Sequence, residues 1–343
     1  MFAKLKSFFG FTKKTNDEIA LSKVDRSVSQ VATNEASQTQ EYGHQSLEHA
    51  RELSLSFVSS LLGVRAVETE QSKAQEDLLR EALDAEITGL SERSIPKLSK
   101  SALSLVSDLT SYDTPQSKIL TAINEDPALA GKVISIANSP LYIASDTEIK
   151  DLDHAVTMIG LVRLKEVVLK SIMADKFELN SYYFETFGKA LWEHSSEVAG
   201  NAKKIAEQSG LNGNQAYFIG LIHDLGKLII FKKLVELHSE EGSEPHPQVF
   251  SNLLSDYSAA LTRRACEVWE LPIDWYQPIL EFQMAEPGDL KQPESVALFL
   301  ANLFAEINAL FAAGEITEFE LIWKLQEVGS SIEEFRELYP ETN

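Results

Sequence analysis

The sequence has few of the residues that covalent cross-links and nucleic-acid contacts require. Its single cysteine, Cys266, excludes an intramolecular disulfide within these 343 residues and is typical of a reducing compartment. Only 31 residues are Lys or Arg against 52 that are Asp or Glu, which gives a net charge of −21. Because binding to a phosphate backbone depends on clustered basic side chains that release counterions, we expect no nucleic-acid partner.

Motifs of several enzyme classes and long apolar runs are also missing. There is no Gly-rich phosphate loop, no GxSxG nucleophile elbow, and no sequence context that makes Cys266 a nucleophile. No apolar stretch is expected to reach the roughly 18–20 residues that cross a bilayer, and the N-terminus lacks an apolar signal core. These absences predict a cytoplasmic protein that is neither secreted nor membrane-spanning.

The first 14 residues, MFAKLKSFFGFTKK, have a charge opposite to that of the rest of the chain. They carry four lysines and no acid, so the other 329 residues hold a net charge of −25, which is −21 less the +4 of this segment. Phe2, Leu5, Phe8 and Phe9 fall at helical spacing, which suits peripheral contact with the inner membrane or with a partner's groove. A terminus that docks on its own domain is the alternative.

Composition and periodicity divide the chain into four parts. A stretch rich in Ser, Thr, Gln and Asn follows the basic segment and cannot bury enough apolar surface to order itself. We therefore expect the following boundaries: a basic N-terminus and linker at 1–45, lead-in helices at 46–90, a main domain at 91–285 with lobes at 91–180 and 181–285, and C-terminal helices at 286–343 that complete the second lobe.

Apolar residues at intervals of three and four predict an all-α fold of antiparallel neighbouring helices. Asp126 and Pro127 are expected to cap and start one helix, which the NSP stretch at 138–140 ends. A long helix at 187–208 should bury a stripe of residues that includes a histidine: Leu191, His194, Val198, Ala202 and Ile205. The next helix is expected to begin near Asn214 and to continue unbroken through IHDLGKLIIF.

A histidine directly precedes an aspartate in GLIHDLGK, Gly220–Lys227. Burial of both side chains is costly unless they are paired or bound to a metal. Neighbouring residues on a helix point about 100° apart, so both could reach one metal if other helices complete its shell. A productive centre would also need a further ligand and an open position for water.

Several motifs in order along the chain resemble the HDOD domain, the HD-related output domain of bacterial signalling proteins. They are DPALAGKVISIANSPLY, LDHAVTMIGLVRLKEVVL, WEHS, GLIHDLGK and WELP, and they cover roughly residues 90–285. The resemblance implies a two-lobed all-α fold. It also implies a second lobe related to the HD phosphohydrolases, which cleave nucleotides or cyclic dinucleotides.

The resemblance further implies a set of metal ligands. His194 matches the first histidine of the HD pattern, and His223 and Asp224 match its central pair. Lys227 matches the lysine after the pair and would contact phosphate. Asn302 stands where the distant aspartate is expected, and a neutral amide oxygen lacks the charge that helps to hold a divalent cation.

Other departures from the family pattern weaken a two-metal centre, because Ser258, Phe282 and Gln283 stand where related sequences often have histidines. Three interpretations stay open: a polar cluster that pins helices together, a bound but inert metal, and live catalysis. The sequence assigns no catalytic residue. A divalent metal (Fe, Mn, Zn or Mg) is the only cofactor that these residues suggest.

The sequence thus favours a non-enzymatic bacterial signal-transduction module with a degenerate HD metal site, which binds a signalling protein partner or a small signal. The alternative is a metal-dependent phosphohydrolase that acts on a nucleotide or cyclic dinucleotide.

Overall fold

A computed structural model gives the structure of the protein. It describes residues 53, 54, 56–58, 60, 61, 70–88, 95, 97–140, 149–176, 188–241, 247–284, 290–328 and 330–340. Within these ranges the chain forms helices and no strands, so the predicted all-α fold is confirmed. The basic segment and the linker predicted within 1–45 lie outside the described residues.

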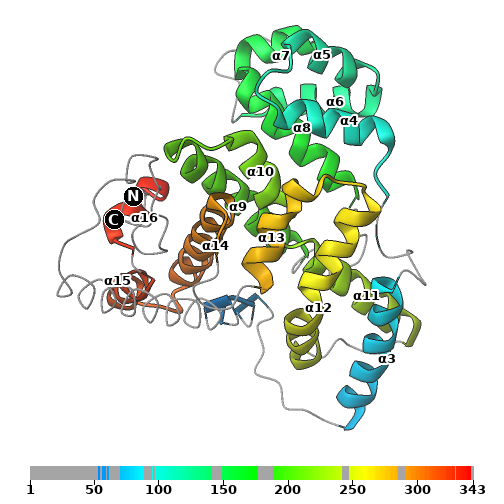
Figure 1. Ribbon diagram of the computed structural model, residues 1–343, viewed down its shortest axis with the longest axis vertical. Helices are drawn as coiled ribbons and strands as arrows, with labels where there is room; N and C mark the ends of the chain where they lie inside the picture. The colour runs from blue at the N-terminus through cyan, green and yellow to red at the C-terminus, as the bar shows by residue number, and fades with distance from the viewer. Residues whose placement is uncertain are drawn as a thin grey trace, which may run out of the picture.

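The described helices form two lobes, with α3 on one side of the second lobe and α15 and α16 on the other (Figure 1). The first lobe consists of α4 (Lys100–Thr110), α5 (Gln116–Asn124), α6 (Pro127–Ala137), α7 (Leu152–Ile159) and α8 (Leu161–Lys176). The second lobe consists of α9 (Lys189–Gln208), α10 (Gly213–Ile222), α11 (Leu225–Glu241), α12 (Pro247–Val268), α13 (Ile273–Met284) and α14 (Pro293–Ala312). The remaining helices are α3 (Glu70–Ile87), which packs on α12, and α15 (Glu318–Glu327) and α16 (Ile332–Leu338), which follow α14.

In the first lobe, polar residues fix the ends of helices. The Asp126 carboxylate accepts hydrogen bonds from the backbone N–H groups of Ala128 and Leu129, and Pro127 occupies the first turn of α6, as predicted. Asn138 ends α6, and its amide exchanges hydrogen bonds with the backbone of Ile149 beyond the following loop. Side chains at helix termini therefore set the path of the chain in this lobe.

In the second lobe, α9 lies at the centre and packs against both α10 and α14, while α11 pairs with α12. The whole predicted stripe of α9 is buried: Leu191, His194, Val198, Ala202 and Ile205. The one histidine among them, His194, lies against Asn302 of α14 and is thus carried into the core of the lobe.

The expectation that no stretch is long and apolar enough to cross a membrane is wrong for α14. This 20-residue helix passes that test by length and composition, but 78% of its most apolar window is buried inside the protein. Neighbouring helices cover its apolar surface, as they do for the central helix of a packed domain.

The predicted unbroken helix through IHDLGK is also wrong, because the chain turns between α10 and α11 at His223 and Asp224. The backbone N–H of Gly226 donates to Thr262 Oγ1 on α12 at 2.9 Å. This hydrogen bond to another helix changes the direction of the chain at this point. His223 therefore follows the last residue of α10, and Asp224 precedes the first residue of α11.

The two lobes meet where the loop after α4 lies on the α9–α10 turn. The Tyr112 hydroxyl donates to the Leu211 carbonyl at 3.1 Å and accepts from the Gly213 N–H at 2.9 Å. Lys203 on α9 forms an ion pair with Glu166 on α8, and both side chains are largely buried. Polar contacts thus hold the lobes together at this junction.

Candidate metal centre

Four predicted site residues converge in the core of the second lobe. Asn302 Oδ1 lies 3.0 Å from His194 Nε2 and 3.1 Å from His223 Nε2. Asp224 Oδ2 lies 3.3 Å from His223 Nε2 and 3.8 Å from His194 Nε2. We call these four residues the HD cluster, and they come from α9, the α10–α11 turn and α14.

Two glycines of GLIHDLGK allow the helices that carry the HD cluster to approach closely. A Cβ atom on Gly220 would lie 2.7 Å from the Ala199 Cα on α9, and one on Gly226 would lie 1.9 Å from the Ser258 carbonyl oxygen on α12. Neither backbone atom can move aside without a shift of its helix. The glycines therefore bring the His-Asp pair up to α9 and α12.

Both histidines of the HD cluster are neutral, and His223 presents a nitrogen lone pair to the cluster. Burial lowers the pKa of His194 to about 3 and also lowers the pKa of His223, although Asp224 opposes both shifts. His223 Nδ1 lies 2.7 Å from the Gly220 carbonyl oxygen, so Nδ1 carries the proton and donates it. His223 Nε2 is then unprotonated, which is the tautomer of a metal ligand.

Asp224 is ionised and paired with Lys227. Burial acts to raise the pKa of Asp224, but His223 and Lys227 outweigh it and hold that pKa at about 2. The Lys227 Nζ lies 2.9 Å from each carboxylate oxygen. Asp224 also precedes the first turn of α11, where the helix dipole favours a negative charge. The ammonium that the family pattern assigns to phosphate is engaged with Asp224 here.

The HD cluster has the donor atoms of a divalent-metal site. Ligand atoms that share one cation in tetrahedral or octahedral geometry lie roughly 3.0–3.4 Å apart, which matches the spacing around Asn302 Oδ1. The donors are two neutral imidazoles, one carboxylate and one amide oxygen. The residues present therefore fit a cation of the Fe, Mn or Zn type better than Mg, which prefers oxygen ligands.

The same heavy atoms also make a hydrogen-bonded network without a metal. If the Asn302 amide is turned by half a rotation, its NH₂ group donates one hydrogen to each unprotonated histidine Nε2, and its oxygen faces the Glu306 carboxyl, which donates to it when protonated. The oxygen and nitrogen of an amide are interchangeable in heavy-atom positions, so the two arrangements differ only in hydrogens. Every lone pair that faces Asn302 is then satisfied.

The HD cluster is closed to solvent. His223, Asp224 and His194 are 0%, 2% and 5% exposed. The Phe57 ring lies over His194 with 4.6 Å between ring centroids, and the Phe282 ring lies 6.4 Å from His223. Phe57 belongs to the described residues of 53–61, which we call the N-terminal strap.

Glu306 is a neighbour of the HD cluster that sequence reasoning missed. It lies one helical turn after Asn302 on α14, is 0% exposed, and accepts a 2.7 Å hydrogen bond from Ser54 of the strap. Burial raises the pKa of Glu306 to about 7, although Lys227 opposes this shift. The i, i+4 spacing from Asn302 was the available signal in the sequence.

The residues that replace family histidines serve the scaffold. Gln283 Nε2 donates to the His223 carbonyl at 2.7 Å, and Phe282 packs between the rings of His223 and Phe299. The Ser258 hydroxyl donates to the Leu254 carbonyl of its own helix. Gln283 therefore supports the turn that carries the His-Asp pair, with one hydrogen bond in place of a metal ligand.

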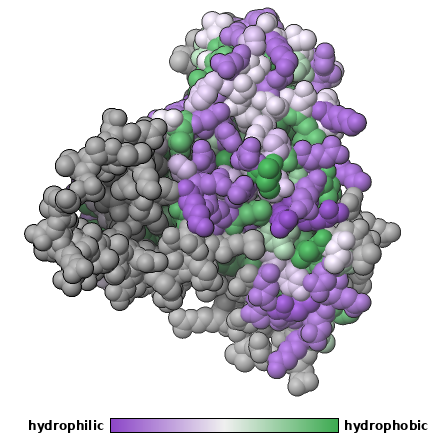
Figure 2. All heavy atoms as spheres, in the orientation of Figure 1, coloured by the Kyte–Doolittle hydropathy of each residue, from purple (hydrophilic) through white to green (hydrophobic). Residues whose placement is uncertain are grey.

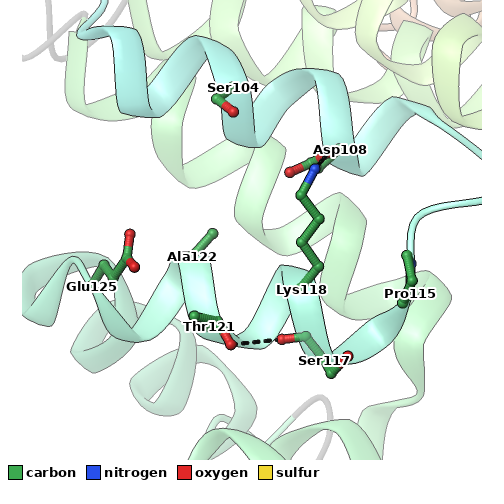
Figure 3. Close-up of a pocket in the computed structure, with 8 residues that line it drawn as sticks. All are labelled: Ser104, Asp108, Pro115, Ser117, Lys118, Thr121, Ala122 and Glu125. Atoms are coloured by element: carbon green, nitrogen blue, oxygen red, sulfur yellow. Dashed lines mark hydrogen bonds and ion pairs between the residues drawn. The ribbon is translucent and has the colours of Figure 1, made fainter.

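Two other features lie apart from the HD cluster. Cys266 is buried, which raises its pKa to about 12 and keeps it a thiol, in line with the absence of a nucleophile context. An open pocket of about 420 Å³ lies between α4 and α5 in the first lobe. Lys118 reaches across it from α5 to Asp108 on α4 at 2.6 Å (Figure 3).

Comparison with known sequences identifies the domain pattern. Residues 95–284 match the HDOD domain. An uncharacterized protein of Treponema pallidum is 26% identical over 243 residues, which cover 66% of this chain and 44% of that protein. A ribonuclease Y of Mesoplasma florum is 28% identical over 131 residues, which cover 35% of this chain and 26% of the enzyme. The chain thus spans less than half the length of these two curated relatives.

Solved structures show the same fold. An HDOD domain protein of unknown function from Geobacter sulfurreducens matches with a TM-score of 0.52 and 24% identity, over 78% of this chain and 93% of that one. A candidate signal transduction protein from Marinobacter aquaeolei matches with a TM-score of 0.50 and 17% identity, over 85% and 62% of the two chains. The predicted resemblance is therefore confirmed.

Proposed function

This chain belongs to the HDOD-domain family, and from that premise we propose that it is a non-enzymatic regulatory module of bacterial signal transduction in the cytoplasm. It binds a signalling protein partner or a small signal. The observation that carries the proposal is the closure of the HD cluster by Phe57 of the strap and Phe282 of α13.

A catalytic metal needs an open coordination position and room for a substrate. In the HD cluster, four protein donors already surround the point where a cation would lie, and Phe57 and Phe282 pack against the two imidazoles. Asn302 adds no charge to stabilise a cation. This arrangement supports a structural role for the HD cluster, in which it ties α9, α14 and the α10–α11 turn into one body.

The junction between the lobes offers a route by which the binding of a ligand to one lobe can affect the other lobe. It combines polar contacts, among them those of Tyr112 with the α9–α10 turn and of Lys203 with Glu166, with the packing of α10 against α4 and α8. A ligand that binds one arrangement of the lobes more tightly shifts the population toward it. The open pocket between α4 and α5 in the first lobe is one place for a small ligand to act (Figure 3).

A second candidate function is a metal-dependent phosphohydrolase that acts on a nucleotide or cyclic dinucleotide. The convergence of two neutral histidine side chains on Asn302 and Asp224 favours it. His194, His223, Asp224 and Asn302 would hold the cation, and Lys227 would contact phosphate. A bound divalent metal would supply a water of lowered pKa. Access for a substrate would require the strap to leave.

Metal content and turnover of the purified full chain test the proposal. We compare the unaltered protein with His223→Ala and with a matched control, His154→Ala, whose histidine is half-buried on α7. Each is loaded in turn with Mn, Fe, Zn and Mg and assayed with bis-p-nitrophenyl phosphate and a cyclic dinucleotide.

We expect turnover no higher than that of His223→Ala with every metal, and a lower melting temperature for His223→Ala than for the control. Metal-dependent turnover that disappears in His223→Ala and persists in His154→Ala would establish the phosphohydrolase instead.

A further inference from the structure

Helix α15 presents two aromatic side chains to solvent on one face. Phe319 is 79% exposed and Trp323 is 50% exposed, and the two lie one helical turn apart. Leu321 and Leu325 on the other face are 1% and 0% exposed and anchor the helix. The aromatic pair therefore contributes little to the packing of α15, and an exposed pair of this size is typical of a contact surface.

The surroundings of the aromatic pair are acidic. Residues 313–343 carry eight acids and two bases, and Glu315 and Glu320 lie exposed on the same part of the chain as Phe319. The Lys324 ammonium lies 6.0 Å from the centre of the Trp323 ring, where the ring face attracts cations. A ligand for this face needs apolar side chains for the two rings and positive charge for the carboxylates.

We propose that residues 1–14 of the same chain dock on this face of α15. The segment has four lysines and no acid, and its apolar residues recur at helical spacing: Phe2, Leu5, Phe8 and Phe9. It thus carries apolar side chains that suit the two rings and a positive charge opposite to that of the α15 face.

The described part of the chain brings this segment into reach. Ser60 of the strap donates to Glu315 at the start of the α15 region, and Ser54 donates to Glu306 on α14. Residues 15–52, a stretch of 38 residues, separate the basic segment from the strap. A chain of that length spans at most roughly 130 Å, so it does not restrict docking, and its covalent attachment raises the local concentration of the segment.

Docking of this kind gives residues 1–14 a second binding partner. The same lysines and apolar side chains suit an anionic lipid surface. The α15 face would therefore withhold the segment from a membrane or from another protein until that competitor is present. This inference does not depend on whether the HD cluster is catalytic.

A disulfide between engineered cysteines tests the proposal in the full chain. Ser7→Cys is combined with Gln326→Cys, which lies on α15 one turn beyond Trp323, and in the control with Ser117→Cys on the exposed face of α5. The native Cys266 is buried and does not compete. Oxidation is followed on non-reducing gels, where a cross-link within one chain keeps the size of a monomer.

We expect the Ser7–Gln326 pair to cross-link at least about tenfold faster than the control pair, as an intramolecular contact. The double substitution Phe319→Ala and Trp323→Ala should bring the rate down to that of the control, and 0.5 M NaCl should lower it, since surface charges are screened. Both aromatic residues are exposed, so an unchanged melting temperature will show that the variant folds.

Equal rates for the two cysteine pairs would overturn the proposal. A disulfide-linked dimer as the main product would overturn it too, because the segment would then lie on a second copy. Pelleting with phosphatidylglycerol vesicles that is lost on deletion of residues 2–14, combined with cross-linking at the control rate, would assign the segment to a membrane.

Discussion

The two lobes place the same kind of ion pair, a lysine with an aspartate, in different environments. In the first lobe, an exposed ammonium and a carboxylate, Lys118 and Asp108, meet across an open pocket, and other polar side chains cap helices. In the second lobe, the part-buried Lys227 pairs with Asp224, which lies in the core beside two neutral histidines. On the face of the molecule that Figure 2 shows, hydrophilic residues predominate and hydrophobic residues are scattered among them.

The difference lies in what each polar group depends on. An exposed ion pair contributes about 0–1 kcal/mol to the free energy of unfolding, because water solvates either partner when the other is removed. A buried one depends on all of its neighbours, since a partner left alone has no water to replace the lost contact. The second lobe therefore responds to substitution as a unit, whereas groups of the first lobe can vary one at a time.

The largest contrast is expected between two glycines. Gly226→Ala would place a Cβ atom 1.9 Å from a backbone oxygen of α12, so we expect it to destabilise the protein by more than about 4 kcal/mol. Gly131→Ala on the exposed side of α6 meets no atom within 4 Å and should stabilise α6 by about 0.5–1 kcal/mol. Thermal melting of both variants measures the contrast, and equal effects would contradict it.

Removal of a carboxylate charge compares the two ion pairs directly. Asp224→Asn leaves the part-buried Lys227 ammonium, 16% exposed, without its carboxylate partner, and we expect a loss of about 2–3 kcal/mol in the free energy of unfolding. The matched change Asp108→Asn in the first lobe should cost less than about 1 kcal/mol. Urea titrations measure both, and a loss for Asp108→Asn as large as that for Asp224→Asn would refute the contrast.

Asn302→Asp restores the acid that the family pattern expects. The new carboxylate should raise the affinity of the HD cluster for Mn or Zn, and metal at a hundredfold excess over its dissociation constant would stabilise the variant by about 2.7 kcal/mol. Asn308→Asp, two positions beyond the buried Glu306 on α14, controls for added charge. Metal content and thermal shift measure the result, which should be absent in the control.

Acid should destabilise the protein through the second lobe. Unfolding returns the pKa of His194 from about 3 to 6.5, and the pKa of His223 also rises, so the unfolded state binds these protons first as pH falls below 6.5. Glu306, with a pKa of about 7 against 4.5 when unfolded, acts in the opposite direction between these values. Burial also raises the pKa of Glu197, which therefore acts in the same direction as Glu306. We expect the two fully buried histidines to dominate, so that the free energy of unfolding falls as the pH is lowered from 6.5 to 4.5.

Urea unfolding at pH 6.5, 5.5 and 4.5 measures this slope. His194→Gln removes one of the two histidines that take up a proton on unfolding and should make the slope smaller, whereas Asp108→Asn should leave it unchanged. A wild-type stability that rises toward pH 4.5 would show that Glu306 dominates.

Much of the fold could be read from local patterns. Asp126 and Pro127 mark the start of α6 because a cap and its helix are neighbours in sequence. The buried stripe of α9, with His194 in it, follows from a period of 3.6 residues. The resemblance to the HDOD family, rather than periodicity, supplied Asn302 as a member of the HD cluster.

Features that depend on distant contacts could not be read in this way. The apolar residues around His223 continue without interruption, yet the helix breaks there because Gly226 packs on Thr262. The spacing of Phe57 predicts a buried helix face but does not show that the ring covers His194. The exposure of Phe319 was equally hidden, because sequence periodicity does not reveal which apolar residue lacks a neighbour.

The strap has a consequence for the order of folding. Its hydrogen bond from Ser54 to Glu306 joins residues 252 positions apart, and closure of such a loop costs more conformational entropy than the local contacts of α9 with α10. We expect the helices of the second lobe to assemble first and the strap to attach late. It should also be the first of these parts to open under native conditions, so that the HD cluster is formed before it is enclosed.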